Sequence, residues 1–224
     1  MRSPAPSARR RIVRGDAPLH AAARDGKLAA LRAALDAGAC IDAVNTAGAT
    51  ALILAAERGD LSACRLLVER GARLEIASRH GVTALYMAVH GGHCDVADFL
   101  LDRGARVDVI DRWGKPMLAW AAQNADGRMF HRLLRIVDGL PSPGAQLRHA
   151  LHWAVLAVPR ADLAIVGTLL DRGLDVHARN DRGDTVLDIL RHDGATDALK
   201  ALLLDKGIDI EAAQPIPPAA PERA

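Results

Sequence analysis

The stretch GVTALYMAVHGGHCDVADFLLDRGARV, residues 81–107, holds two short apolar segments separated by a pair of glycines. The first segment follows Thr83 and ends at Gly91–Gly92, and the second ends at Gly104. Threonine is a favoured helix N-cap, and glycine is favoured just past the C-terminal end of a helix. The stretch therefore predicts a helix, a tight turn, a second helix and an extended loop.

This unit recurs along the chain with a period of 33 residues. Its opening glycine appears at Gly15, Gly48, Gly81 and Gly114, and a later copy, Gly183, lies 69 residues after Gly114. A leucine four residues after each anchor keeps the register, even in the unit that lacks the glycine (Leu19, Leu52, Leu85, Leu118, Leu151 and Leu187). Self-similarity at 20–50 residues is typical of stacked repeats. We expect about six of them, at 15–47, 48–80, 81–113, 114–146, 147–182 and 183–211.

The composition fits helices that pack through small side chains. The 224 residues are 50% hydrophobic but only 3% aromatic. Such a core must be built mainly from alanine, leucine and valine, which favours stacked helices over a β-sandwich or barrel. We expect core packing for Trp120 and Trp153, which occupy one register position. The next position is alanine in every first helix but the last, where it lets helices approach closely (Ala22, Ala55, Ala88, Ala121 and Ala154).

The units resemble ankyrin repeats. The opening motif of that family, G-x-T-P-L-H-x-A-A, is matched by residues 15–23, GDAPLHAAA, and in part by residues 48–52 and 81–85. Its closing motif, L-L-x-x-G-A-D-V-N, is matched by residues 100–108, LLDRGARVD. The resemblance implies an all-α ankyrin-repeat solenoid of about six helix-turn-helix repeats, with connecting loops or short hairpins, over residues 15–211. It also assigns His20 a local hydrogen bond.

Repeats four and five depart from the pattern. Repeat four ends in a proline-containing segment at 141–143, and repeat five has Leu147 in place of the anchor glycine. Repeat five also gains three residues near Pro159, which cannot continue a helix. Two interpretations stay open, namely sequence drift in a tolerant array and a local bend that shapes a binding surface.

Both ends of the chain differ from the repeats. Residues 1–14 carry five arginines and no acidic residue, which leaves a net charge of −3 for the rest of a chain whose total is +2. We expect a disordered basic tail over 1–14 and a disordered Pro/Ala-rich tail over 212–224. The mildly acidic repeat region disfavours nucleic acid as the partner.

No catalytic constellation emerges from the sequence. Nucleotide-binding, serine-hydrolase and zinc-protease motifs are absent. His80, His90, His93 and Cys94 form the densest group of metal-ligating types, but they span a loop and a turn, whereas zinc needs converging ligands. The acids of the D-R-G and E-R-G helix ends are interpreted as solvated. We therefore expect no enzyme, no metal and no cofactor.

The family resemblance implies a non-catalytic scaffold or adaptor that binds a partner protein on its concave face of loop tips and first-helix ends. Trp113 is the strongest candidate, because it lies at a loop tip, and Trp and Arg dominate binding hot spots. The alternative is that Trp113 folds back onto its own repeat. We expect a monomer, an unidentified protein partner and no small-molecule substrate. The residues projected onto this face are Glu57, Arg58, Arg79, His80, Tyr86, His90, Arg112, Trp113 and Lys115.

Location and two further functions follow from weaker signals. No run of 18 apolar residues occurs, and no apolar segment follows the N-terminal arginines, so we expect a cytoplasmic protein without a membrane span. The three cysteines form no CxxC motif, which fits a reducing compartment. The arginine-rich composition resembles that of a bacterial protein. The alternatives are a translocated bacterial effector that binds a host protein, and a regulatory subunit of an enzyme carried on another chain.

The irregular repeats predict a weak point in the array. Because repeats four and five lose the regular loop and anchor, their stacking should be the least stable. We expect backbone amides of residues 117–171 to exchange with deuterium faster than those of residues 51–102 in a hydrogen-exchange time course. Slower exchange in residues 117–171 would contradict this prediction.

Overall fold

The computed structural model describes residues 17–124, 126–140, 147, 150–156, 162–180 and 182–210. Its regular elements within these ranges are helices, as expected for an all-α repeat fold, and the chain divides into two compact units, residues 1–115 and 116–224. The two tails and the irregular segments at 141–143 and 157–161 lie outside the described residues.

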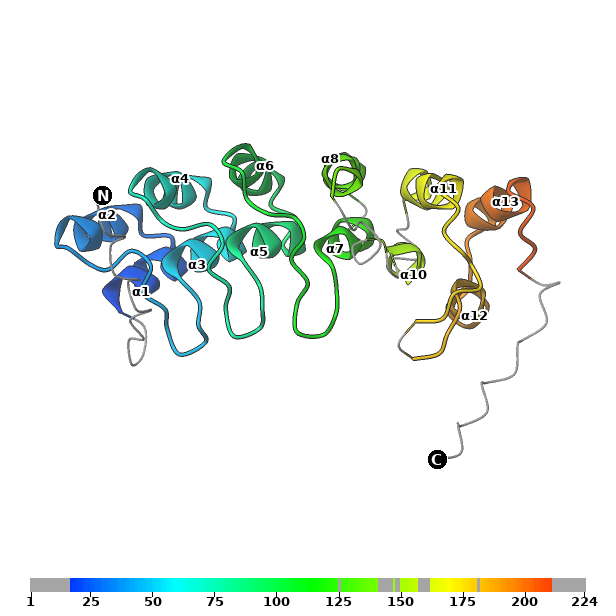
Figure 1. Ribbon diagram of the computed structural model, residues 1–224, viewed down its shortest axis with the longest axis horizontal. Helices are drawn as coiled ribbons and strands as arrows, with labels where there is room; N and C mark the ends of the chain where they lie inside the picture. The colour runs from blue at the N-terminus through cyan, green and yellow to red at the C-terminus, as the bar shows by residue number, and fades with distance from the viewer. Residues whose placement is uncertain are drawn as a thin grey trace, which may run out of the picture. The chain divides into compact units, whose positions relative to one another are not determined.

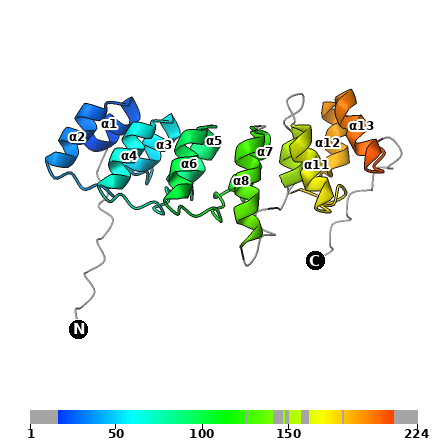
Figure 2. The same cartoon turned by 90° about the horizontal axis from the view of Figure 1, so that it is seen from above.

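The first unit stacks three helix pairs in two rows (Figures 1 and 2). Each helix contacts its partner in the pair and the next helix in its own row. The loops between successive pairs extend on the inner-row side, away from the outer helices (Figure 1). The inner row is α1 (Pro18–Asp25), α3 (Ala51–Arg58) and α5 (Ala84–His90), and the outer row is α2 (Leu28–Asp36), α4 (Leu61–Glu69) and α6 (Cys94–Asp102).

The second unit has the same two-row plan. Helix α7 contacts α10, and α10 contacts α12, while α11 joins α8 to α13 in the outer row. First helices begin 33 residues apart from α1 to α10, and 36 residues separate the starts of α10 and α12. The inner row is α7 (Met117–Gln123), α10 (Ala150–Leu156) and α12 (Val186–Asp193), and the outer row is α8 (Gly127–Asp138), α11 (Leu163–Asp171) and α13 (Asp197–Asp205).

Short polar side chains start the helices where the sequence places them. The predicted N-caps are confirmed, because three hydroxyls each accept a bond from the N–H three residues on (Thr50, Thr83 and Thr185). Pro18 begins α1, as its fixed φ favours. Several outer helices are capped by aspartates that the sequence analysis had not assigned (Asp60, Asp126 and Asp162).

The inner rows are packed through alanine. The five register alanines are each 5% exposed or less, which confirms their predicted role (Ala22, Ala55, Ala88, Ala121 and Ala154). The expectation for the neighbouring position is wrong in degree, because Trp120 and Trp153 are only half-buried. An indole is too large to enter a stack whose spacing is set by alanine, so these rings remain partly at the surface.

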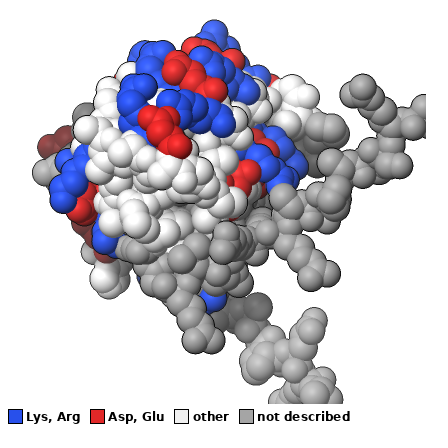
Figure 3. Space-filling view, turned by 90° about the vertical axis from the view of Figure 1, so that its left-hand side faces the viewer, with Lys and Arg blue, Asp and Glu red and all other residues white. Residues whose placement is uncertain are grey.

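Acidic and basic side chains link successive outer helices. The last acid of one outer helix pairs with the cation that follows the next outer helix, at 2.8 Å for Asp36–Arg70 and 2.5 Å for Asp138–Arg172. Lys206 pairs with Asp171 in the same way. The interpretation of these acids as merely solvated is therefore wrong at these positions. Figure 3 shows the two charge types intermingled on the side of α2 and α4.

None of the helices in the described ranges is both long and apolar enough to cross a membrane.

The buried thiol of α4 yields a prediction about reactivity. Cys64 has no exposed surface, and burial raises its pKa to about 12, with Asp60 and Asp95 acting in the same direction. Because the thiolate is the reactive form, we expect Cys64 to react with Ellman's reagent at pH 8 only as the fold opens, after exposed Cys40. Cys40→Ser should remove the earlier absorbance phase. Labelling of Cys64 in that phase would contradict the structure.

Candidate functional site

Each loop tip is closed by one short polar side chain at its base. In the loop that precedes α7, Asp111 Oδ1 accepts hydrogen bonds from the backbone N–H groups of Trp113 and Lys115, both at 2.9 Å. Asn45 and Asn180 make the equivalent pair of bonds in their own loops. The tips therefore have a defined backbone shape, and the side chains that they carry are held in place.

Neighbouring tips of the first unit are joined by backbone hydrogen bonds. Arg79 N donates to Ala47 O at 3.0 Å, and one period later Arg112 N donates to His80 O, also at 3.0 Å. These bonds place the Arg79–His80 tip beside the Arg112–Trp113 tip. We call these four residues the loop-tip surface.

Trp113 is the most exposed large apolar residue of the described chain, at 64%. Its indole stacks on the ring of His80, with ring centroids 5.6 Å apart and an interplanar angle of 11°. The guanidinium carbon of Arg112 lies 4.2 Å from the Trp113 ring centroid. Such cation–π and stacking contacts restrict the rotamers of a surface indole. Trp113 is therefore held at the surface by its neighbours and does not fold into the core of its own repeat.

Tyr86 does not belong to this exposed surface, which corrects the sequence-based expectation. The residue is 2% exposed, and its hydroxyl donates to Asp111 Oδ2 at 2.8 Å, with Lys115 O at 3.2 Å. Tyr86 holds the helix position that His20 holds in the first repeat, where the imidazole Nε2 bonds Ala43 O at 2.9 Å. Its polar tip anchors the loop from below, and it supports the loop-tip surface without reaching a partner.

Lys115 is also buried, at 7% exposure, and is removed from the contact set for the same kind of reason. Asp111 N donates to Lys115 O, so residue 115 is drawn back to the base of the loop. Burial lowers the pKa of Lys115 to about 8, and the carboxylate of Asp111 opposes that shift.

The remaining predicted residues lie at the ends of the inner helices. Glu57, Arg58 and His90 are exposed. Burial lowers the pKa of His90, and so does the Lys115 charge, while the carboxylates of Glu57 and Asp111 oppose the shift. His90 therefore lies within electrostatic reach of the base of the Trp113 loop.

Arg58 packs onto the preceding repeat. A Cβ placed on Gly26, whose φ is +70°, would lie only 2.4 Å from the Arg58 Nε. The guanidinium therefore covers the end of α1, which makes Arg58 a stacking residue as well as a surface residue.

Histidines of the candidate metal group have other roles. The His93 imidazole Nε2 lies 3.0 Å from Glu57 O and packs against Gly59. His80 stacks on Trp113. Among the described residues no group of three or more His, Cys, Asp or Glu side chains is arranged to hold a metal ion.

Comparison with known proteins agrees with this geometry. The family model for ankyrin repeats in three copies matches residues 19–111. These residues are ankyrin repeats. Ankyrin repeats are protein-interaction modules, and the described helices outside the match continue the same all-helical plan.

A solved structure extends the likeness beyond the family match. It contains the predatory endopeptidase Bd0816 from Bdellovibrio bacteriovorus in complex with the immunity protein Bd3460, and the similar chain is the immunity protein. The TM-score is 0.69 at 28% sequence identity, and the similarity covers 84% of the present chain and 97% of that one. Comparison with curated protein sequences yields no match.

The buried lysine under the loop-tip surface can be tested by titration. The chain has four lysines, so a sample labelled with ¹³C at lysine Cε should give few, resolvable NMR signals. We expect the Lys115 signal, identified by its loss in Lys115→Met, to titrate near pH 8 rather than near 10.5. Because the unfolded chain binds more protons in that interval, the free energy of unfolding should rise with pH from about 8 to about 10.5 relative to Lys115→Met. A midpoint near 10.5 would show that the ammonium is solvated.

Proposed function

We propose that the chain is a non-catalytic scaffold that binds a partner protein through the loop-tip surface of its first unit. The observation that carries this proposal is Trp113, an exposed indole held between the neighbours that stack on it, His80 and Arg112. An aromatic residue ordered before binding loses little side-chain entropy when a partner covers it. Tryptophan and arginine are also the residue types that dominate interface energetics.

The charges around Trp113 indicate what the partner surface carries. Arg79 and Arg112 are both exposed and lie on adjacent tips. A guanidinium stacked on an indole keeps its N–H edge available for bidentate bonding to a carboxylate. The fitting partner site therefore pairs an acidic side chain with an apolar or aromatic pocket for the indole.

A second candidate function makes this chain the antagonist of an enzyme on another chain. In the similar solved structure an immunity protein is in complex with a predatory endopeptidase, and the likeness spans most of both chains. We infer by analogy that the partner here is an enzyme of the peptidase class. This function and the general scaffold share one surface and differ in the effect of binding on the partner. The translocated effector, a third alternative, depends on the basic tail over residues 1–14.

The domain limits and location enter as parts of the proposal. We propose a repeat domain over residues 15–211 that acts as a monomer in a reducing, cytoplasmic setting. The three cysteines, which are all free thiols, support the choice of compartment.

Double substitution of the loop-tip surface tests the proposal. We expect Trp113→Ala with Arg112→Ala to weaken binding of the partner by about 30-fold or more, since hot-spot truncations cost roughly 2 kcal/mol or more. The measurement is quantitative mass spectrometry of proteins captured from the source cells, followed by calorimetry with the purified partner. Circular dichroism checks that the variant retains its helices.

A matched control separates the site from general loss of surface. Leu204→Ala with Arg73→Ala removes an apolar residue of similar exposure, 60%, and one exposed arginine from elsewhere on the chain. This control should bind the partner like the wild type. Undiminished capture by the Trp113 variant would sink the loop-tip assignment. For the second candidate function, the purified chain should inhibit the captured enzyme in a peptide-cleavage assay, and inhibition should vanish with the Trp113 variant.

A further inference from the structure

The second unit contains a cavity of about 520 Å³ beside α10 and α12. Its lining comes from these two helices and from the loop that enters α12. The volume lies in the range of cavities that receive a small ligand or a large side chain, roughly 300–1,000 Å³. None of its lining residues belongs to the loop-tip surface, so this site is separate from the proposed function.

One wall of the cavity is apolar. Trp153 and Leu156 are three positions apart on α10 and therefore share a face of that helix, while Ile189 comes from α12. Trp153 is half-buried, so its ring is partly covered by protein and partly at the surface. A wall of this kind suits the methylene stem of a long side chain and the flat face of a delocalised cation.

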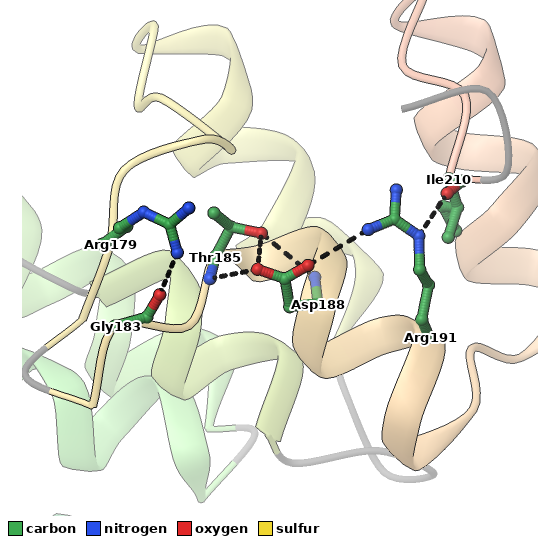
Figure 4. Close-up of polar contacts among 6 residues, drawn as sticks. All are labelled: Arg179, Gly183, Thr185, Asp188, Arg191 and Ile210. Carbon is green, nitrogen blue, oxygen red and sulfur yellow. Dashed lines mark hydrogen bonds and ion pairs between the residues drawn. The ribbon is translucent and has the colours of Figure 1, made fainter. Parts of the chain in front are cut away.

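The opposite lining is acidic, and one of its carboxylates is a fixed structural group. Asp188 accepts from Thr185 N at 3.0 Å and Thr185 Oγ1 at 2.8 Å, and its pKa is lowered mainly by these bonds (Figure 4). Arg191 lies 3.1 Å from Asp188 and also donates to Ile210 O (Figure 4). The charge of Asp188 is thus compensated within the fold, and its position is fixed by the start of α12.

Two further carboxylates give the cavity its remaining acidic character. The backbone of Asp184 is fixed on both sides, because its N–H donates to Asn180 Oδ1 and its carbonyl lies 3.2 Å from His152 Nε2. Asp193 is exposed at the end of α12, where His192 can balance it only when protonated. The lining holds three aspartates against one arginine, Arg182.

We propose that this cavity receives an arginine side chain of a partner protein. The guanidinium lies on the Trp153 ring and donates to the carboxylates of Asp184 and Asp193, and the stem packs on Leu156 and Ile189. Arginine fits better than lysine, because a planar guanidinium stacks on an indole and reaches two carboxylates at once. The site would give the array a second point of contact with opposite charge preference to the loop-tip surface.

The three tryptophans supply a direct test with the full chain. Their indole N–H signals can be followed by ¹⁵N NMR during titration with N-acetyl-L-arginine amide, with Trp153 assigned through Trp153→Phe. We expect a saturable shift of the Trp153 signal with a Kd in the millimolar range. Trp113, which lies beside Arg112, should not shift in the same way. N-acetyl-L-citrulline amide, a neutral compound of similar shape, should bind at least 5-fold more weakly.

Variants of the carboxylates complete the test. Asp184→Asn and Asp193→Asn should each weaken binding of the arginine compound at least 3-fold, whereas Asp205→Asn, which makes the same charge change outside the lining, should leave it unchanged. If Asp184→Asn disturbs the helical signal in circular dichroism, Asp193→Asn at the exposed helix end carries the test alone. Equal affinity for the citrulline compound, or wild-type affinity in both folded variants, would overturn the proposal.

Discussion

The stacking of the inner helices depends on side chains that are almost absent. Helices α3 and α5 contact each other through a row in which Ala55 and Ala88 are completely buried. Close packing leaves no room for a larger group at these positions without displacing the backbone. This constraint explains why the chain carries so few aromatic residues, and why Trp120 and Trp153 remain partly at the surface.

Because each inner helix has the same spacing from the next, the loops that leave them arrive in register. Arg79 N then meets Ala47 O, and Arg112 N meets His80 O, one period further along the first unit. The loop-tip surface is thus a consequence of the stack, with each tip shaped by a polar side chain at its base. Rigid tips on a packed scaffold are well suited to recognition, since little order has to be created on binding.

The elements that depend on neighbouring residues in the chain were predictable, and those that depend on contacts between repeats were not. Thr50 and Thr83 cap helices as expected, because a cap bonds an amide only three residues away. Tyr86 was assigned to the surface, although its register position, shared with His20, indicates a hydrogen bond into the following loop. Lys115 was missed for a different reason. Its burial follows from the way Asp111 closes the loop, and residue type alone predicts an exposed lysine.

The amino-acid sequence by itself determined the repeat, its helices and the class of fold, because caps, glycine stops and the alanine register act over a few residues and recur every 33. Only the tertiary structure decided which side chains of a loop face outward. It also gathered Trp153, Asp184 and Asp193 around one cavity, although about 40 residues of chain separate the first from the last. Such groupings depend on how far successive repeats approach each other, which is a property of packed surfaces and not of any single segment.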